Sequence, residues 1–272
     1  MSGTDIKQLL TSAEYQAIRQ ANSPSASNPF ATLDDIEGDQ FGSRYIYSFK
    51  EAFDKGVIPA GWTQSKSGAG AGVVYTQAYE TYSIGQVQIN TNGNAISFAS
   101  VIYANAINYI LNFVTNCVFT KWNTLIRRAP GDVGVGLAGL ANNTGSVVPS
   151  AFGNVIALVH DPNNMTTANP GLTGNWFVWV KNGVGQSFYN TGIAPTGVWQ
   201  FVEFDYTSAG VEVKINGAVV VTVPTSDPNL FTSQAPAAGA GLKPVLYTGK
   251  GVATAGANSL RVDQFNLYRK WN

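Results

Sequence analysis

From Tyr45 to the C-terminus the sequence consists of short segments rich in β-branched and aromatic residues, and this pattern restricts the possible fold more than any other feature. Segments such as NVIALVH (154–160) and WQFVEFDY (199–206) have the length and residue types of strands, and turns rich in Gly, Asn and Pro separate them. Asn216-Gly217, between VEVKI and AVVVTV, predicts a two-residue hairpin turn. Because no strand–helix alternation is present, we expect an all-β sandwich or jelly roll, in which SFKEAFDKG (48–56) is the one helical interruption, or a loop.

Residues 1–40 differ from the rest, so we predict a domain boundary there, with a β-sandwich over residues 41–272. Thr11 and Glu14 have the spacing of a capping box, and Pro24 follows the helix that they begin. About ten helical residues are marginally stable alone in water, so we expect this segment to dock on another protein or to oligomerise; the alternative is a disordered polar leader. The apolar residues expected to make the docking contacts are Leu10, Tyr15, Ile18, Phe30, Leu33 and Ile36.

The composition excludes several classes of partner. Charged residues make up only 12% of the chain, and the formal net charge is zero. A neutral chain gives no electrostatic reason to expect nucleic acid or an anionic membrane as a partner.

Cys117 is the only cysteine, so no intrachain disulfide can form, and its apolar neighbours favour a buried thiol. We see neither a secretory signal nor an apolar run of about 18 residues, and therefore expect folding in the cytoplasm and no membrane span.

Three stretches resemble concanavalin A-like domains of the laminin-G or legume-lectin type. They are YSFKEAFDKGVIPAGWTQ (47–64), GVWQFVEFDYTSAGVEVKINGAVVVTV (197–223) and LRVDQFNLYR (260–269). They are similar, in order, to the family's opening edge strand and turn, its late hairpin and its closing strand. The resemblance implies a concanavalin-like jelly-roll sandwich, and such a fold suggests glycan binding.

Residues 10–36, LTSAEYQAIRQANSPSASNPFATLDDI, resemble the N-terminal segment of bacteriophage head-fibre, tail-fibre and spike proteins. This resemblance implies an accessory virion protein, assembled in the host cytoplasm and exposed on the particle surface. It also implies a homotrimer that docks on a capsid, portal or tail protein through residues 1–40. We therefore expect a non-enzymatic structural protein that decorates the capsid or forms a fibre or spike and that contacts host surface glycans. The alternatives are a free carbohydrate-binding lectin and, less favoured, a glycoside hydrolase.

The sequence gives little support for catalysis by a histidine or by a serine nucleophile. His160 is the only histidine, and it stands where the strand-like ALVHDPNN (157–164) runs into a turn. No Gly-x-Ser-x-Gly nucleophile motif is present. We therefore expect His160 to be a surface or loop residue rather than a catalytic one.

Glu203 and Asp205 are the carboxylates that most resemble a catalytic pair. They are two residues apart in a predicted strand and so share one face. Related laminarinase-type enzymes carry Glu-x-Asp-x-(x)-Glu on such a strand, but Thr207 and Ser208 stand here in place of the general acid. We expect both acids to lie on the outer side of the strand, with Val202, Phe204 and Tyr206 pointing inward, and no residue to be catalytic.

No cofactor is expected except a structural calcium ion, which several concanavalin-like families hold at a loop. The resemblance makes Asp132, Asp161, Asn163 and the adjacent Asn164 candidate oxygen ligands, although turn chemistry alone also explains them. The large aromatic residues available to stack on a sugar ring include Trp122, Trp176 and Trp199, although we expect most of them to pack in the core.

Overall fold

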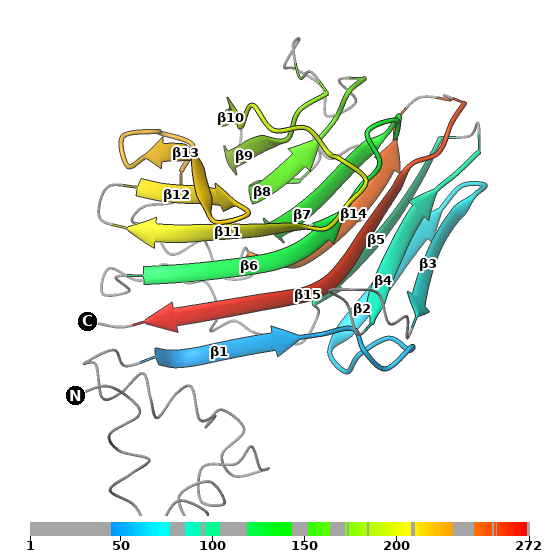
Figure 1. Ribbon diagram of the computed structural model, residues 1–272, viewed down its shortest axis with the longest axis horizontal. Helices are drawn as coiled ribbons and strands as arrows, with labels where there is room; N and C mark the ends of the chain where they lie inside the picture. The colour runs from blue at the N-terminus through cyan, green and yellow to red at the C-terminus, as the bar shows by residue number, and fades with distance from the viewer. Residues whose placement is uncertain are drawn as a thin grey trace, which may run out of the picture.

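The computed structural model describes residues 45–76, 85–93, 96–103, 119–142, 152–163, 172, 174–183, 185–207, 210–230, 242–251, 253 and 255–270. These residues form two antiparallel sheets (Figure 1). No helix occurs among them. The structure therefore confirms the prediction of an all-β jelly-roll sandwich.

The first sheet has eight strands in the order β13-β12-β11-β6-β15-β4-β3, and β1 pairs with β15 beside this path. Because β15 is long, its first half pairs with β4 and its second half with β1. The strands are β1 (Tyr45–Glu51), β3 (Ala71–Thr76), β4 (Gln86–Thr91), β6 (Phe119–Arg127), β11 (Gln200–Thr207), β12 (Gly210–Ile215), β13 (Ala218–Pro224) and β15 (Ser259–Lys270).

The second sheet has seven strands in the order β10-β9-β8-β7-β14-β5-β2. Both sheets combine hairpin neighbours with strands that are distant in sequence, as β14 between β7 and β5 illustrates. The strands are β2 (Trp62–Ser67), β5 (Ser97–Tyr103), β7 (Val135–Ala141), β8 (Asn154–His160), β9 (Phe177–Asn182), β10 (Gly185–Asn190) and β14 (Lys243–Lys250).

One hydrophobic core fills the space between the sheets, because alternate residues of the strands point into it. Trp122 of β6 is at its centre and is fully buried. Its ring stacks on Phe204 with ring centroids 4.1 Å apart and on Phe265 at 5.4 Å. This packing fixes β11, β6 and β15 side by side and so sets which residues of these strands face outward.

A second buried apolar cluster covers the other face of the second sheet. It includes Val155, Ala157 and Val159 of β8, whose alternate residues Ile156 and Leu158 belong to the central core. Both faces of β8 are therefore buried, which explains why its sequence is a continuous apolar run rather than an alternating one.

The predicted hairpin turn at Asn216-Gly217 joins β12 and β13. Both turn residues have positive φ, 53° at Asn216 and 82° at Gly217, as a two-residue hairpin turn requires. The turn is also tied to β11, since the backbone N–H of Asn216 donates to the carbonyl oxygen of Phe201 at 2.7 Å. The side-chain oxygen of Asn216 accepts from the N–H of Phe201 at 2.9 Å.

Several local expectations were wrong. Residues 48–51 of the expected helix or loop at 48–56 belong to strand β1, and no helix follows them. We did not predict β2, β10 or β14, although β14 lies inside the second sheet. The sequence also predicts a strand over residues 109–122. Residues 109–118 lie outside the described residues, and β6 extends beyond Trp122 to Arg127.

Within the part of the chain that the structure describes, no helix is long and apolar enough to span a membrane.

Candidate functional site

Strand β11 presents two carboxylates on the outer face of the first sheet. Val202 and Phe204 are fully buried in the core. The side chains of Glu203 and Asp205, which alternate with them, are 14% and 20% exposed. The structure thus agrees with the predicted inward and outward sides of this strand.

Two lysines from the neighbouring strands hold these carboxylates. The Nζ of Lys121 on β6 lies 2.5 Å from Oε1 of Glu203 and 3.6 Å from Oδ1 of Asp205. On the other side, the Nζ of Lys214 on β12 donates to Oδ2 of Asp205 at 2.8 Å. Burial lowers the pKa of Lys121, but the hydrogen bond to Glu203 and the charges of both acids outweigh this effect and raise it. The hydrogen bond to Asp205 likewise raises the pKa of Lys214, so both ammonium groups are charged at neutral pH.

A pair of amides continues this surface onto β15. Asn123 lies opposite Glu203 in the ladder between β6 and β11, and Asn266 lies opposite Asn123 on β15. The Nδ2 of Asn266 donates to Oδ1 of Asn123 at 2.8 Å. The result is a strip of carboxylates, ammonium groups and amides across four strands. We call it the outer band, and it consists of Lys121, Asn123, Glu203, Asp205, Lys214 and Asn266.

The chemistry of the outer band suits hydrogen bonding to hydroxyl groups. Carboxylates and amide oxygens accept hydrogen bonds, while ammonium and amide N–H groups donate them. Among the tryptophans that we considered for sugar stacking, Trp122 and Trp176 are fully buried and offer no face to a ligand. Trp199 is half-buried and directly precedes β11.

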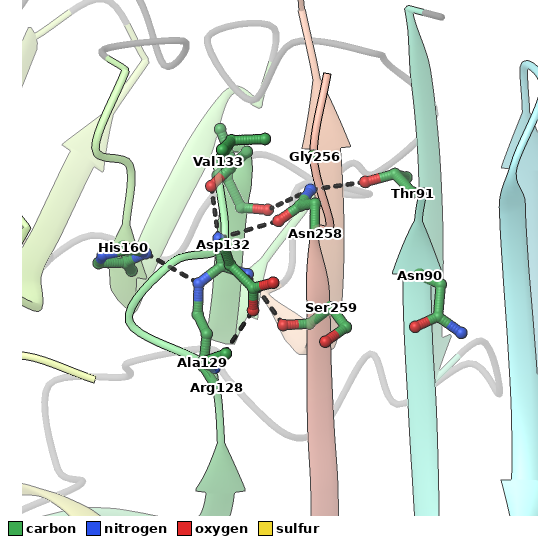
Figure 2. Close-up of polar contacts among 12 residues, drawn as sticks. Asn90, Thr91, Arg128, Ala129, Asp132, Val133, His160, Gly256, Asn258 and Ser259 are labelled. Atoms are coloured by element: carbon green, nitrogen blue, oxygen red, sulfur yellow. Dashed lines mark hydrogen bonds and ion pairs between the residues drawn. The ribbon is translucent and has the colours of Figure 1, made fainter. Parts of the chain in front are cut away.

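His160 differs from the sequence expectation. It is fully buried at the end of β8, where its Nδ1 accepts a hydrogen bond from Nε of Arg128 at 2.8 Å (Figure 2). Burial, together with the charge of Arg128, lowers the pKa of His160 to about 3. The prediction of a surface or loop histidine was therefore wrong, because a buried arginine that directly follows β6 supplies its partner.

Arg128 is the centre of a buried polar network (Figure 2). Its terminal nitrogens donate to the carbonyl oxygens of Ser259 at 3.0 Å and Gly134 at 2.5 Å, and to Oδ1 of Asn258 at 2.9 Å. The carboxylate of Asp132 lies 3.8 Å away. Burial lowers the pKa of Arg128 to about 10, which still leaves it charged at neutral pH.

Asn258 extends the network to both sheets, because its Nδ2 donates to Oγ1 of Thr91 at 2.5 Å and to the carbonyl oxygen of Gly249 at 3.2 Å. Thr91 belongs to β4 of the first sheet and Gly249 to β14 of the second. The network therefore joins the sheets at this end of the sandwich, and its role is structural.

Three of the predicted calcium ligands lie near this network, and the fourth, Asn164, is outside the described residues. Asp132 and Asp161 are buried, and Oδ2 of Asp132 accepts from the backbone N–H of Ala129 at 3.2 Å. The Nδ2 of Asn163 donates to the carbonyl oxygen of Val133 at 2.5 Å. Among the described residues, no group of three or more His, Cys, Asp or Glu side chains could hold a metal ion. The calcium site stays a prediction, and the charge of Arg128 beside Asp132 opposes it.

Sequence reasoning missed the residues around the two acids. Lys214 was the easiest to find, because the two-residue turn at Asn216-Gly217 fixes the register of its strand. By contrast, Lys121 and Asn266 come from strands far from β11 in sequence, and nothing local indicates their pairing. The six predicted docking residues within residues 1–40, and Cys117, lie outside the described part of the chain.

No protein-family model and no curated protein matches this chain. Solved structures do match. A protein of unknown function from Shewanella oneidensis has a TM-score of 0.54 at 12% identity, covering 96% of this chain and 95% of that one. A beta-1,3-glucanase from Mycobacterium marinum has a TM-score of 0.51 at 13% identity, covering 82% and 98%. A glycoside hydrolase family 16 endo-glucanase from Bacteroides ovatus has a TM-score of 0.52 at 10% identity, covering 80% and 99%.

At these identities the likeness shows a shared fold, the concanavalin-like jelly-roll sandwich that we expected. It contradicts our expectation of a non-enzymatic protein, because several of these neighbours are glycoside hydrolases. None of the three proteins above is described as a virion protein.

Proposed function

We propose that this protein is carbohydrate-active and that it recognises a polysaccharide on the outer band. The observation that carries this proposal is the carboxylate pair Glu203 and Asp205, held on an outer sheet face by Lys121 and Lys214. The pair offers charged acceptors beside charged donors in a fixed arrangement, which suits recognition of a ligand rich in hydroxyl groups. The fold shared with glucanases supports the choice of carbohydrate as the ligand class.

The amide pair supports the same assignment. Asn123 and Asn266 bind each other through one N–H and one oxygen, which orients both side chains next to Glu203. Sugar hydroxyl groups both donate and accept hydrogen bonds. A fixed strip of amides and carboxylates can pair with both functions. Half-buried Trp199, which directly precedes the same strand, is the candidate stacking residue.

Binding is tested with laminarin and a mixed-linkage glucan by isothermal titration calorimetry. Hydrogen bonds to charged groups are worth about 1.5–3 kcal/mol, so Glu203→Gln with Asp205→Asn should weaken binding about tenfold or more. The control Gln64→Ala, on an exposed position of β2 in the other sheet, should bind as the wild type does. An unchanged affinity in the double variant, with both proteins folded, would remove the outer band as the binding surface.

Hydrolysis is the second candidate function, and the proximity of the two acids favours it. Retaining glycosidases place two carboxyl groups about 5–5.5 Å apart, one as nucleophile and one as general acid. Glu203 and Asp205 lie on one face and contact the same ammonium group. Positions 207 and 208 are Thr and Ser, so the two roles fall to these acids or to Glu212, which lies opposite Asp205 in the ladder between β11 and β12. Release of reducing sugar from either glucan, lost in Glu203→Gln alone, is the expected result for an enzyme.

Attachment to a virion is a separate proposal that rests on the sequence of residues 10–36. Residues 1–40 would bind a capsid, portal or tail protein as part of a homotrimer and display the sandwich on the particle surface. A carbohydrate-active sandwich is compatible with this placement, because host surfaces carry glycans.

A further inference from the structure

Two arginines lie directly opposite each other on the outer face of the first sheet. Arg127 of β6 pairs with Arg261 of β15 in the register of these strands. Their neighbours Ile126 and Val262 are fully buried in the core, so alternation directs both arginines outward. Both are half-buried.

The neighbouring groups hold this pair in place. The Nε of Arg127 donates to the carbonyl oxygen of Gly197 at 2.7 Å, which fixes its side chain against the segment that leads into β11. In this segment Val198 is 62% exposed and is followed by half-buried Trp199. On the other side Arg261 pairs with Gln88 of β4. The arginine pair therefore lies between an aromatic residue and an amide, both common contacts of sugars.

The register places the two guanidinium groups side by side on one outer face, so their donors can act on the same ligand group. The guanidinium group is planar and presents its N–H donors in a fork that matches the two oxygens of a carboxylate or sulfate group. The pair is also continuous with the outer band, because Asn123 is four residues from Arg127 along β6. Four residues of a strand span roughly 13 Å, a distance that a short oligosaccharide can bridge.

We propose that Arg127 and Arg261 form a subsite for the acidic group of a sugar, so that the polysaccharide recognised on the outer band is an acidic one. The shared chemistry is a planar or tetrahedral oxyanion, supplied by a uronate carboxylate or by a sulfate ester. This inference rests on the proposed function, because it assigns the ligand of the same surface. It extends that proposal from carbohydrate in general to a charged class.

The test compares three polymers by isothermal titration calorimetry: polygalacturonate for carboxylate, dextran sulfate for sulfate, and laminarin as the neutral reference. We expect one acidic polymer to bind at least tenfold more tightly than laminarin, and its identity distinguishes the two oxyanions. The double variant Arg127→Gln with Arg261→Gln should lose this preference while its affinity for laminarin stays within about twofold. Arg127→Lys with Arg261→Lys keeps the charges without the fork and should recover only part of the preference.

Each result has a definite meaning. Equal binding of all three polymers overturns the acidic subsite and leaves the carbohydrate proposal intact. A preference for acidic polymers that survives the glutamine substitutions, or that the lysine variant retains in full, also overturns it, since general charge attraction would then explain the result. If no polymer binds, both the inference and the proposed function fail. Thermal melts of each variant show whether the fold is retained.

Discussion

At the scale of single residues, Arg128 is the side chain on which the sandwich depends most. It is fully buried and donates to acceptors from three separate segments of the chain. Removal of the guanidinium group takes a donor away from each of these buried acceptors and takes away the positive charge beside the Asp132 carboxylate.

We expect Arg128→Met to lower the free energy of unfolding by about 3–5 kcal/mol, as the loss of one member of a buried ion pair does. Urea unfolding followed by tryptophan fluorescence measures this change. Lys66→Met on the exposed strand β2 is the control and should stay within about 0.5 kcal/mol of the wild type. A stability loss below about 1 kcal/mol in Arg128→Met would show that the network contributes little.

His160 gives the protein a specific dependence on pH. Its pKa is about 3 in the folded protein and near 6.5 in an unfolded chain, so the unfolded state binds the proton first as pH falls. This group's contribution to stability is therefore complete above pH 6.5 and is lost progressively between about pH 6.5 and pH 3.

His160→Gln tests this dependence, because an amide oxygen can still accept from Arg128 and does not titrate. Between pH 7 and pH 5.5 the wild type should lose about 1 kcal/mol more stability than the variant does. Urea unfolding at the two pH values gives the comparison. Parallel losses in the two proteins would mean that His160 is protonated equally in the folded and unfolded states.

At the scale of elements, the turn between β2 and β3 shows how a glycine fixes the edge of the sandwich. Gly70 has a φ of 78°, and a Cβ there would overlap the carbonyl of Asn92. The backbone at Gly70 lies close enough to Asn92 for a hydrogen bond, which the N–H of Asn92 donates to the carbonyl oxygen of Gly70 at 3.0 Å. We expect Gly70→Ala to cost about 1–3 kcal/mol of stability, from both strain and overlap.

Gly72 is the matched control, because it lies two residues away in β3 and a Cβ there would meet no atom within 4 Å. Gly72→Ala should be neutral or slightly stabilising, since alanine reduces the entropy of the unfolded chain. Thermal denaturation of both variants by circular dichroism separates the two effects. Similar melting temperatures for the two would contradict the requirement for glycine at position 70.

The same scale shows what the sequence could predict. The segments β11, β12 and β13 were found because they alternate clearly and because Asn216-Gly217 marks the turn between two of them. In contrast, β14 was missed because its sequence KPVLYTGK contains Pro, Gly and two lysines, which weaken a strand pattern. Its final residue, Lys250, is buried and donates to the carbonyl oxygens of Gly93 and Gly256, contacts that no local pattern reveals.

At the scale of the molecule, the outer band exists only because strands distant in sequence are neighbours in the first sheet. Glu203 and Asp205 share a face by local alternation, and so could be predicted as a pair. The position of β6 between β11 and β15 places Lys121, Asn123 and Asn266 beside them. Sheet order is a property of the whole fold, which is why the sequence indicated two acids without the groups that surround them.

The division of the chain into residues 1–40 and 41–272 leads to the last prediction. The central core contains residues from Phe53 to Leu267, and the first described strand, β1, begins at Tyr45. A truncated protein that starts at Phe41 retains every described strand. It should be β-rich and melt in one cooperative transition close to that of the full-length protein.

A second truncation that starts at Ala52 is the matched control. It removes β1, and thereby the partner of residues 265–270 of β15, so its melting temperature should fall clearly below that of the first truncation.

The full-length protein should be a trimer by light scattering and the Phe41 truncation a monomer, because burial of Phe30, Leu33 and Ile36 contributes roughly 1.5–3 kcal/mol each before ordering costs. Phe30→Ser should weaken the trimer more than Ser25→Ala. If the Phe41 truncation keeps the oligomeric state of the full-length protein, residues 1–40 do not hold the oligomer together, and their proposed docking role is wrong.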